Sequence, residues 1–213
     1  MNTDVVNSFD MEDYMEKNTE FEAGLNKTLN EIITHSIRVS NLAYNLAKEM
    51  ELTDEQCYDI ANAGALHDIG KIKLMPYMYQ ESDMDYTLKK MYYMRMHSGL
   101  SYDILCGRGY SDFVLESVLH HHENYDGSGY PDNLQGEDIP IGARILRISD
   151  VYSALTSDRV YRDALDMESA IKVMIGEIKN FDMKIFLAFQ RVIHEVNIDD
   201  GKRKEDLGKW LSQ

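Results

Sequence analysis

The chain has 213 residues, of which 44% are apolar, so it can bury the core of one large domain or two small ones. Asp and Glu (37) outnumber Lys and Arg (22), and the net charge of −15 argues against a protein that binds nucleic acid polymers or membrane surfaces, because both are polyanions. The longest stretch without Asp, Glu, Lys or Arg, 39–47, is far shorter than the ~20 apolar residues of a membrane span. The acidic N-terminus predicts no signal peptide and the two cysteines predict no disulfide framework, so a cytoplasmic protein is expected.

Residues that favour helices dominate the chain, and runs of alternating β-branched residues are nearly absent, which predicts an all-α fold. Residues 1–24 form an acidic segment that is expected to be helical, 25–196 the main domain, and 197–213 a charged tail. Within the main domain, apolar periodicity and capping residues predict helices at 25–50, 54–66, 85–105, 111–122, 140–156, 167–179 and 183–196.

Two stretches between these helices have unusual compositions. Residues 123–138 are rich in Gly, Asp and Asn, which predicts a loop. Gly70 breaks the helical pattern, and residues 75–96 then interleave Met with Tyr. This segment is interpreted as a loop and a helix packed by adaptable Met side chains, or as a mobile lid over a site.

Several histidines and carboxylates stand where a helical fold would bring them together. Glu31 and His35 are four residues apart, so they share one face of a helix. His67-Asp68 and His121-His122 are adjacent pairs at helix ends, where neighbouring side chains can converge on one point. Asp150 lies in a largely apolar helix, where a carboxylate needs a partner such as a metal.

This donor set predicts a metal site with more than one ion. Imidazole and carboxylate donors without cysteine suit iron, manganese or zinc, and they argue against a structural zinc site. More than six candidate donors exceed the needs of one ion. Two ions ~3.5–4 Å apart are the usual arrangement for hydrolysis of phosphoesters.

Two motifs resemble those of the HD-GYP family, a branch of the HD-superfamily phosphohydrolases. Residues 67–71 (HDIGK) resemble its HDxGK motif, and residues 121–131 (HHENYDGSGYP) resemble its long HHExxDGxGYP signature. The block 144–162 and the pair Phe181-Asp182 are similar to later parts of the family pattern, so the resemblance covers about 30–196. It implies an HD-superfamily helical bundle around two or three ions of iron or manganese. The implied activity is hydrolysis of cyclic di-GMP to linear pGpG, and often onward to GMP.

The resemblance also implies roles for individual residues. Asp68 would bridge metal ions, and Lys71 would assist the phosphate or the attacking water, which makes them the catalytic candidates. Tyr130 would lie in a loop beside the substrate, and Arg159 and Arg162 would contact its phosphate or guanine groups. A helix-end salt bridge with Asp158 or Asp163 is the alternative for the two arginines. The implied metal ligands are Glu31, His35, His67, Asp68, His97, His121, His122 and Asp150.

Two departures from the family pattern leave other functions open. Ser153 stands where the family usually has an Asp, which bears on catalytic rate, and residues 75–94 replace a common Lys-Pro-Gly segment, which bears on substrate fit. One alternative is an HD phosphohydrolase that acts on another nucleotide or cyclic dinucleotide. Another is a catalytically weak sensor of the cyclic dinucleotide. Diguanylate cyclase domains and a second copy of the chain are further partners consistent with the resemblance.

Overall fold

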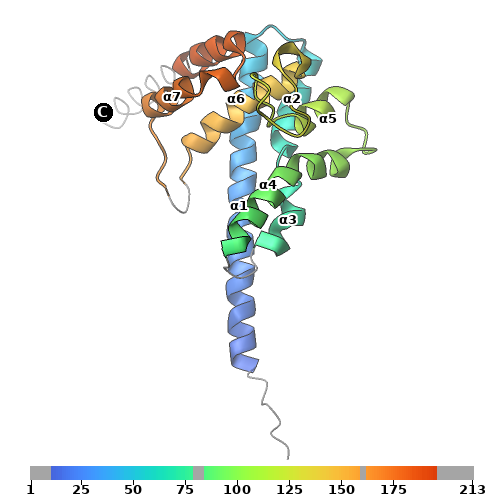
Figure 1. Cartoon of the computed structure of the whole chain (residues 1–213), viewed down its shortest axis with the longest axis vertical. Coiled ribbons are helices and arrows are strands. Elements are labelled where there is room, and N and C mark those ends of the chain that lie inside the picture. Colours follow the sequence, from blue (N-terminus) through green and yellow to red (C-terminus); the bar gives the residue numbers. More distant parts are fainter. Residues whose placement is uncertain (1–10, 79–83, 159–161, 196–213) are drawn as a thin grey trace, which may run out of the picture.

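The computed structural model describes residues 11–78, 84–158 and 162–195 (Figure 1). The regular elements in these ranges are helices, which confirms the predicted all-α fold. They are α1 (Met11–Glu49), α2 (Asp54–Leu66), α3 (Lys71–Met78), α4 (Met84–Leu105), α5 (Asp112–Leu119), α6 (Ile141–Leu155) and α7 (Met167–Gly176), with short 3-10 turns at Gly136–Asp138 and Ile178–Asn180. Residues 183–195 are helical as well.

The longest element is α1, and its N-terminal part extends away from the other helices (Figure 1). It runs without a break through the expected boundary between the acidic segment and the main domain at 24/25. The expected tail, 197–213, and residues 1–10 lie outside the described residues.

The core forms where α1 and α2 pack against each other and against α6. Val39, Ala43 and Leu46 are fully buried on one face of α1, because their spacing of four and three matches the helical repeat. The turn into α2 is fixed by the capping box that the sequence predicts: Gln56 N donates to Thr53 Oγ1 and Thr53 N to Gln56 Oε1, both at 3.2 Å. This packing holds the ends of α2 and α6 close to the middle of α1.

Two predicted helix ends are wrong by three residues, and one helix was not predicted. The helix expected at 111–122 ends at Leu119, because His120 leaves the helical conformation with φ −101° and ψ 10°. The helix expected at 167–179 ends at Gly176 and continues as a 3-10 turn. The helix α3 at Lys71–Met78 was not predicted, and its last residues, 75–78, lie in the segment that was expected to begin as a loop.

No helix among the described residues is long and apolar enough to cross a membrane.

Candidate metal centre

Three buried histidines are each held in the same way by the backbone of the preceding helical turn. The Nδ1 atoms of His67, His97 and His121 each lie within hydrogen-bond distance of the carbonyl oxygen three residues earlier, which belongs to Gly64 (2.8 Å), Met94 and Val118 (2.6 Å), respectively. A carbonyl can only accept, so each Nδ1 carries the proton and each Nε2 carries a lone pair. This is the tautomer that a histidine needs to bind a metal through Nε2.

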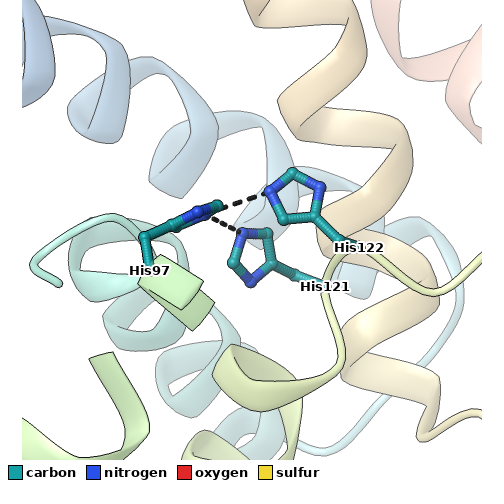
Figure 2. Close-up of side chains that lie close together, drawn as sticks. All are labelled: His97, His121 and His122. Carbon is teal, nitrogen blue, oxygen red and sulfur yellow. Dashed lines mark hydrogen bonds between the residues drawn. The ribbon is translucent and has the colours of Figure 1, made fainter. Parts of the chain in front are cut away.

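The Nε2 atoms of His97 and His121 lie close together, and the side chain of a third histidine, His122, joins them (Figure 2). His97 Nε2 lies 3.2 Å from His121 Nε2 and 3.0 Å from His122 Nε2. Burial lowers the pKa of all three histidines, that of His122 to about 3, so they are neutral near pH 7. Lone pairs that converge at this distance repel each other unless a cation lies between them. This group therefore fits a metal ion.

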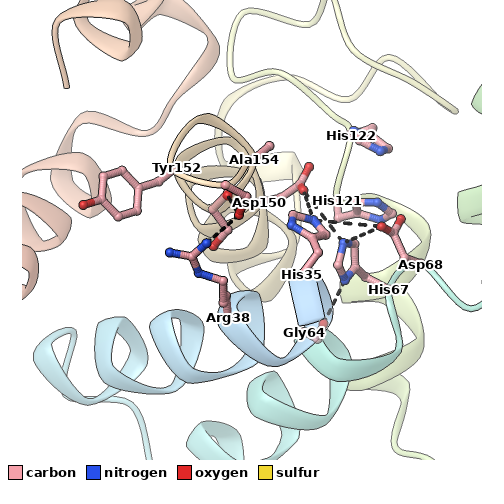
Figure 3. Close-up of polar contacts among 12 residues, drawn as sticks. His35, Arg38, Gly64, His67, Asp68, His121, His122, Asp150, Tyr152 and Ala154 are labelled. Atoms are coloured by element: carbon pink, nitrogen blue, oxygen red, sulfur yellow. Dashed lines mark hydrogen bonds and ion pairs between the residues drawn. The ribbon is translucent and has the colours of Figure 1, made fainter. Parts of the chain in front are cut away.

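A second group of donors forms between α1, the end of α2 and α6 (Figure 3). His35 Nε2 lies 2.9 Å and His67 Nε2 3.8 Å from Asp150 Oδ1. Burial opposes ionisation of Asp150, but the hydrogen bond with His35 and the charge of His67 hold its pKa well below the usual range. His67 Nε2 is buried without a hydrogen-bond partner, as expected of an atom whose partner is a metal.

Asp68 lies between the two groups. Its Oδ1 is 3.3 Å from His97 Nε2, and its Oδ2 is 3.4 Å from His67 Nε2 and 2.6 Å from Lys71 Nζ. Burial opposes ionisation, but His67, Lys71 and His97 together hold the pKa of Asp68 below its usual range. Oδ1 has no hydrogen-bond partner although it is buried. One carboxylate thus turns an oxygen toward each group.

The structure brings together seven of the eight predicted metal ligands. In each of three sets, the donor atoms lie within 4.8 Å of one another: His97, His121 and His122; His35, His67 and Asp150; and His67, Asp68 and His121. Glu31 belongs to none of them and is exposed. It lines a cavity of about 160 Å³ that also contains His35, Asp68 and Lys71, so its carboxylate lies at the edge of the centre.

The residues predicted to bind substrate have different positions. The Tyr130 ring stacks on His122, with centroids 4.8 Å apart, and burial raises the pKa of Tyr130 to about 12. Arg162 donates through one terminal nitrogen to the carbonyl oxygens of Ala154 and Leu155 at the end of α6, both at 3.0 Å. Arg159 lies outside the described residues.

Ser153, which replaces the usual Asp of the resembled family, is buried in α6. Its carbonyl accepts a hydrogen bond from Ser157 Oγ at 2.6 Å, and Arg38 of α1 donates to the same Ser157 oxygen at 2.7 Å. The backbone of Ser153 therefore takes part in the connection between α1 and the end of α6.

Sequence reasoning missed the residues that support the ligands. Ser101 follows His97 by one helical turn, and its Oγ donates to the His67 carbonyl at 2.7 Å while it accepts from Gly70 N at 2.8 Å. Glu123 is buried, and its Oε1 accepts from the backbone N–H of Asp132 at 2.7 Å, which closes the loop that carries Tyr130. The four-residue spacing from His97 was the available signal for Ser101.

Gly70 is expected to be required for this assembly. A Cβ at position 70 would lie 2.2 Å from the His97 carbonyl oxygen and 2.7 Å from Ser101 N, both backbone atoms. Gly70→Ala should therefore lower the free energy of unfolding by about 1–3 kcal/mol, as overpacking of a buried contact does. Urea denaturation followed by circular dichroism measures it.

Gly99 on the same helix, α4, is the matched control. A Cβ there would meet no atom within 4 Å, so Gly99→Ala should leave the free energy of unfolding unchanged or raise it by up to about 1 kcal/mol. Equal stability of the two variants would show that the Gly70 contact is not tight.

Comparison with known proteins gives consistent matches. A family model described as HD domain matches residues 20–185. A cyclic di-GMP phosphodiesterase of Pseudomonas aeruginosa is 36% identical over 165 residues, which are 75% of this chain and 38% of that protein. The 3'3'-cGAMP-specific phosphodiesterase 1 of Vibrio cholerae is 32% identical over 154 residues, which are 71% of this chain and 36% of that protein. The chain spans less than half the length of these relatives.

The fold is also found among solved structures. A Bdellovibrio bacteriovorus protein described as a HDG"Y"P protein aligns with a TM-score of 0.60 at 19% sequence identity, over 76% of this chain and 52% of that one. At this identity the likeness concerns the fold alone.

Proposed function

The chain belongs to the HD-domain family, and on this basis we propose that it is a metal-dependent phosphodiesterase of the HD-GYP branch that hydrolyses cyclic di-GMP. The observation that carries the proposal is the position of Asp68, with one oxygen toward His97 and the other toward His67. A carboxylate shared by two groups of imidazoles is suited to two adjacent divalent cations. That pairing is the usual means of hydrolysing a phosphodiester.

The proposed ligands divide between two ions. His97, His121 and His122 would hold one ion, His35, His67 and Asp150 the other, and Asp68 would bridge them. Bound divalent ions would neutralise charge on the phosphoryl oxygens and lower the pKa of a water molecule. Iron or manganese suits imidazole and carboxylate donors without cysteine.

Residues of the chain would orient the substrate and its protons. The Lys71 ammonium, 2.6 Å from Asp68 Oδ2, keeps that oxygen ionised and places a positive charge beside the scissile phosphate. Tyr130 stays protonated near pH 7 because burial raises its pKa, so its hydroxyl can donate a hydrogen bond to the substrate. Contacts of Arg159 and Arg162 with phosphate or guanine, and a diguanylate cyclase partner, stay predictions.

The test is metal analysis combined with product analysis. Protein loaded anaerobically with Fe²⁺ or Mn²⁺ should convert cyclic di-GMP to pGpG, and chelation should stop the reaction. A parallel incubation with 3'3'-cGAMP decides between substrates, because one of the relatives is named for that compound. Turnover of 3'3'-cGAMP alone would support the alternative phosphohydrolase, and binding without turnover of either would support the sensor.

Replacement of Glu31 tests for a third ion. If Glu31 and His35 hold an additional ion, Glu31→Ala should remove about one metal per chain and reduce hydrolysis without abolishing it. Mass spectrometry of metal content measures this. Because Glu31 is exposed, the protein fold should be unaffected. An unchanged metal content would leave a centre of two ions.

A further inference from the structure

The cations around the candidate centre differ in whether they already have a partner. Lys71 pairs with Asp68 at 2.6 Å, and Arg144 pairs with Asp182 at 2.7 Å. Arg162 donates to carbonyl oxygens at the end of α6. The chain as a whole carries a charge of −15, so it repels anions at long range. Beyond Lys71 and the proposed metal ions, an anionic substrate therefore depends on local cations that have no acid partner.

Arg147 is such a cation. It precedes Asp150 by three residues on α6, so the two side chains share one face of the helix. Its Nε donates to Asn124 Oδ1 at 3.0 Å, and among the described residues no carboxylate lies within ion-pair distance of it. Burial is the main cause that lowers the pKa of His122, and the charge of Arg147 adds to it, which is consistent with a position beside the histidines.

A second arginine, Arg95, lies against Tyr130, which belongs to the same loop as Asn124. Its guanidinium carbon is 5.5 Å from the centroid of the Tyr130 ring, which itself stacks on His122. Arg95 is exposed, and it has no carboxylate partner among the described residues. The loop that carries Tyr130 is thus flanked by two arginines whose guanidinium groups have no acid partner in the described part of the chain.

We infer that Arg147, assisted by Arg95, binds the second phosphate of the cyclic dinucleotide while the first is held for hydrolysis. This inference rests on the proposed function. A cyclic dinucleotide has two phosphodiesters, and only one can be attacked at a time, so the other needs a cation outside the metal ligands. With Nε bound to Asn124, the guanidinium is fixed in orientation, and its two terminal nitrogens can form the bidentate contact that phosphate favours.

The test compares four variants in the metal-loaded protein. Arg147→Gln removes the charge, Arg147→Lys keeps it without the planar fork, and Asn124→Ala removes the supporting hydrogen bond but keeps the arginine. Arg191→Gln is the control, because Arg191 pairs with Glu49 on the surface away from the centre. The readouts are KM and kcat for cyclic di-GMP at increasing salt concentration, and the Kd of a phosphorothioate analogue of cyclic di-GMP that resists hydrolysis.

We expect Arg147→Gln to raise KM and Kd about tenfold and to weaken their dependence on salt, with a smaller change for Arg147→Lys. Asn124→Ala should change Kd less than Arg147→Gln does, and Arg191→Gln should have no effect. Adding Arg95→Gln to Arg147→Gln should raise Kd further.

Two outcomes would overturn the inference. The Kd of Arg147→Gln could equal that of the unmodified protein, or Asn124→Ala could reproduce the whole effect, which would mean that Arg147 only supports the loop. Binding of the analogue without hydrolysis of cyclic di-GMP by the unmodified protein would overturn the proposed activity and leave the comparison of variants intact. If the unmodified protein neither bound the analogue nor hydrolysed cyclic di-GMP, both the inference and the proposed activity would be overturned.

Discussion

Replacement of Asp68 with asparagine is expected to lower hydrolysis of cyclic di-GMP by at least about 100-fold and to reduce the bound metal. Replacing residues that merely support a metal ligand already costs about 10–100-fold in metal affinity or activity, and Asp68 contacts both donor groups itself. The amide has nearly the same shape, so the buried position stays filled. It loses the negative charge that would offset the charge of the ions. Mass spectrometry of metal content and a hydrolysis assay measure the two effects.

A surface variant of the same type separates this effect from a general loss of charge. Asp54 pairs with Lys48 at the start of α2, and its side chain is 80% exposed, so Asp54→Asn should keep full metal content and activity. Circular dichroism should show the same helical content for both variants. If Asp68→Asn retained its metals and most of its activity, the centre would not be built around a shared carboxylate.

The ligands of the candidate centre could be predicted because their chemistry is tied to local sequence. His67-Asp68 and His121-His122 follow the ends of α2 and α5, where the chain leaves the helix and two adjacent side chains can turn inward. His97 was different, because only the family resemblance predicted it as a metal ligand. In the structure its Nε2 lies 3.0 Å from that of His122, although 25 residues separate them.

The parts that could not be predicted depend on contacts between distant segments. Gly70 looks like a helix breaker in the sequence, whereas in the structure it allows the turn after α2 to touch the backbone of α4 at His97. The helix α3 then begins at once with Lys71. No periodicity within residues 67–78 contains that contact, so this helix was not predicted, and the loop expected from residue 75 was wrong for 75–78.

Contacts between distant segments also decide which arginines lie near the proposed substrate position. Arg162 was a candidate because of its motif, yet its guanidinium contacts the end of its neighbouring helix. Arg147 and Arg95 belong to different helices, and they contact Asn124 and Tyr130 of one loop because α6 and α4 both approach it. Their shared position became visible only in three dimensions.

The metal-free protein is expected to lose stability as the pH falls from about 6.5. Burial lowers the pKa of His97, His121 and His122 in the folded state, that of His122 from 6.5 to about 3. Between these values the unfolded chain binds protons that the folded protein does not, so the free energy of unfolding decreases as the pH is lowered. Each such histidine contributes a slope of up to about 1.4 kcal/mol per pH unit.

The carboxylates of the centre affect the free energy of unfolding only at lower pH. The lowered pKa values of Asp68 and Asp150 contribute stability that is present above their ordinary value of 3.8 and is lost only below it. Urea denaturation of chelator-treated protein between pH 7 and pH 4.5 therefore isolates the histidines. His122→Gln should reduce the slope in this range by up to about 1.4 kcal/mol per pH unit.

The matched control for the titration is His194, which is exposed in the helix at 183–195. His194→Gln removes a histidine outside the buried group, so the slope expected from His97, His121 and His122 should persist in this variant. The metal-loaded protein should hold its stability to lower pH than the metal-free protein, because protons must displace the ions before they reach the Nε2 atoms. A free energy of unfolding that stays constant from pH 7 to pH 4.5 in the metal-free protein would contradict the neutral, buried state of these histidines.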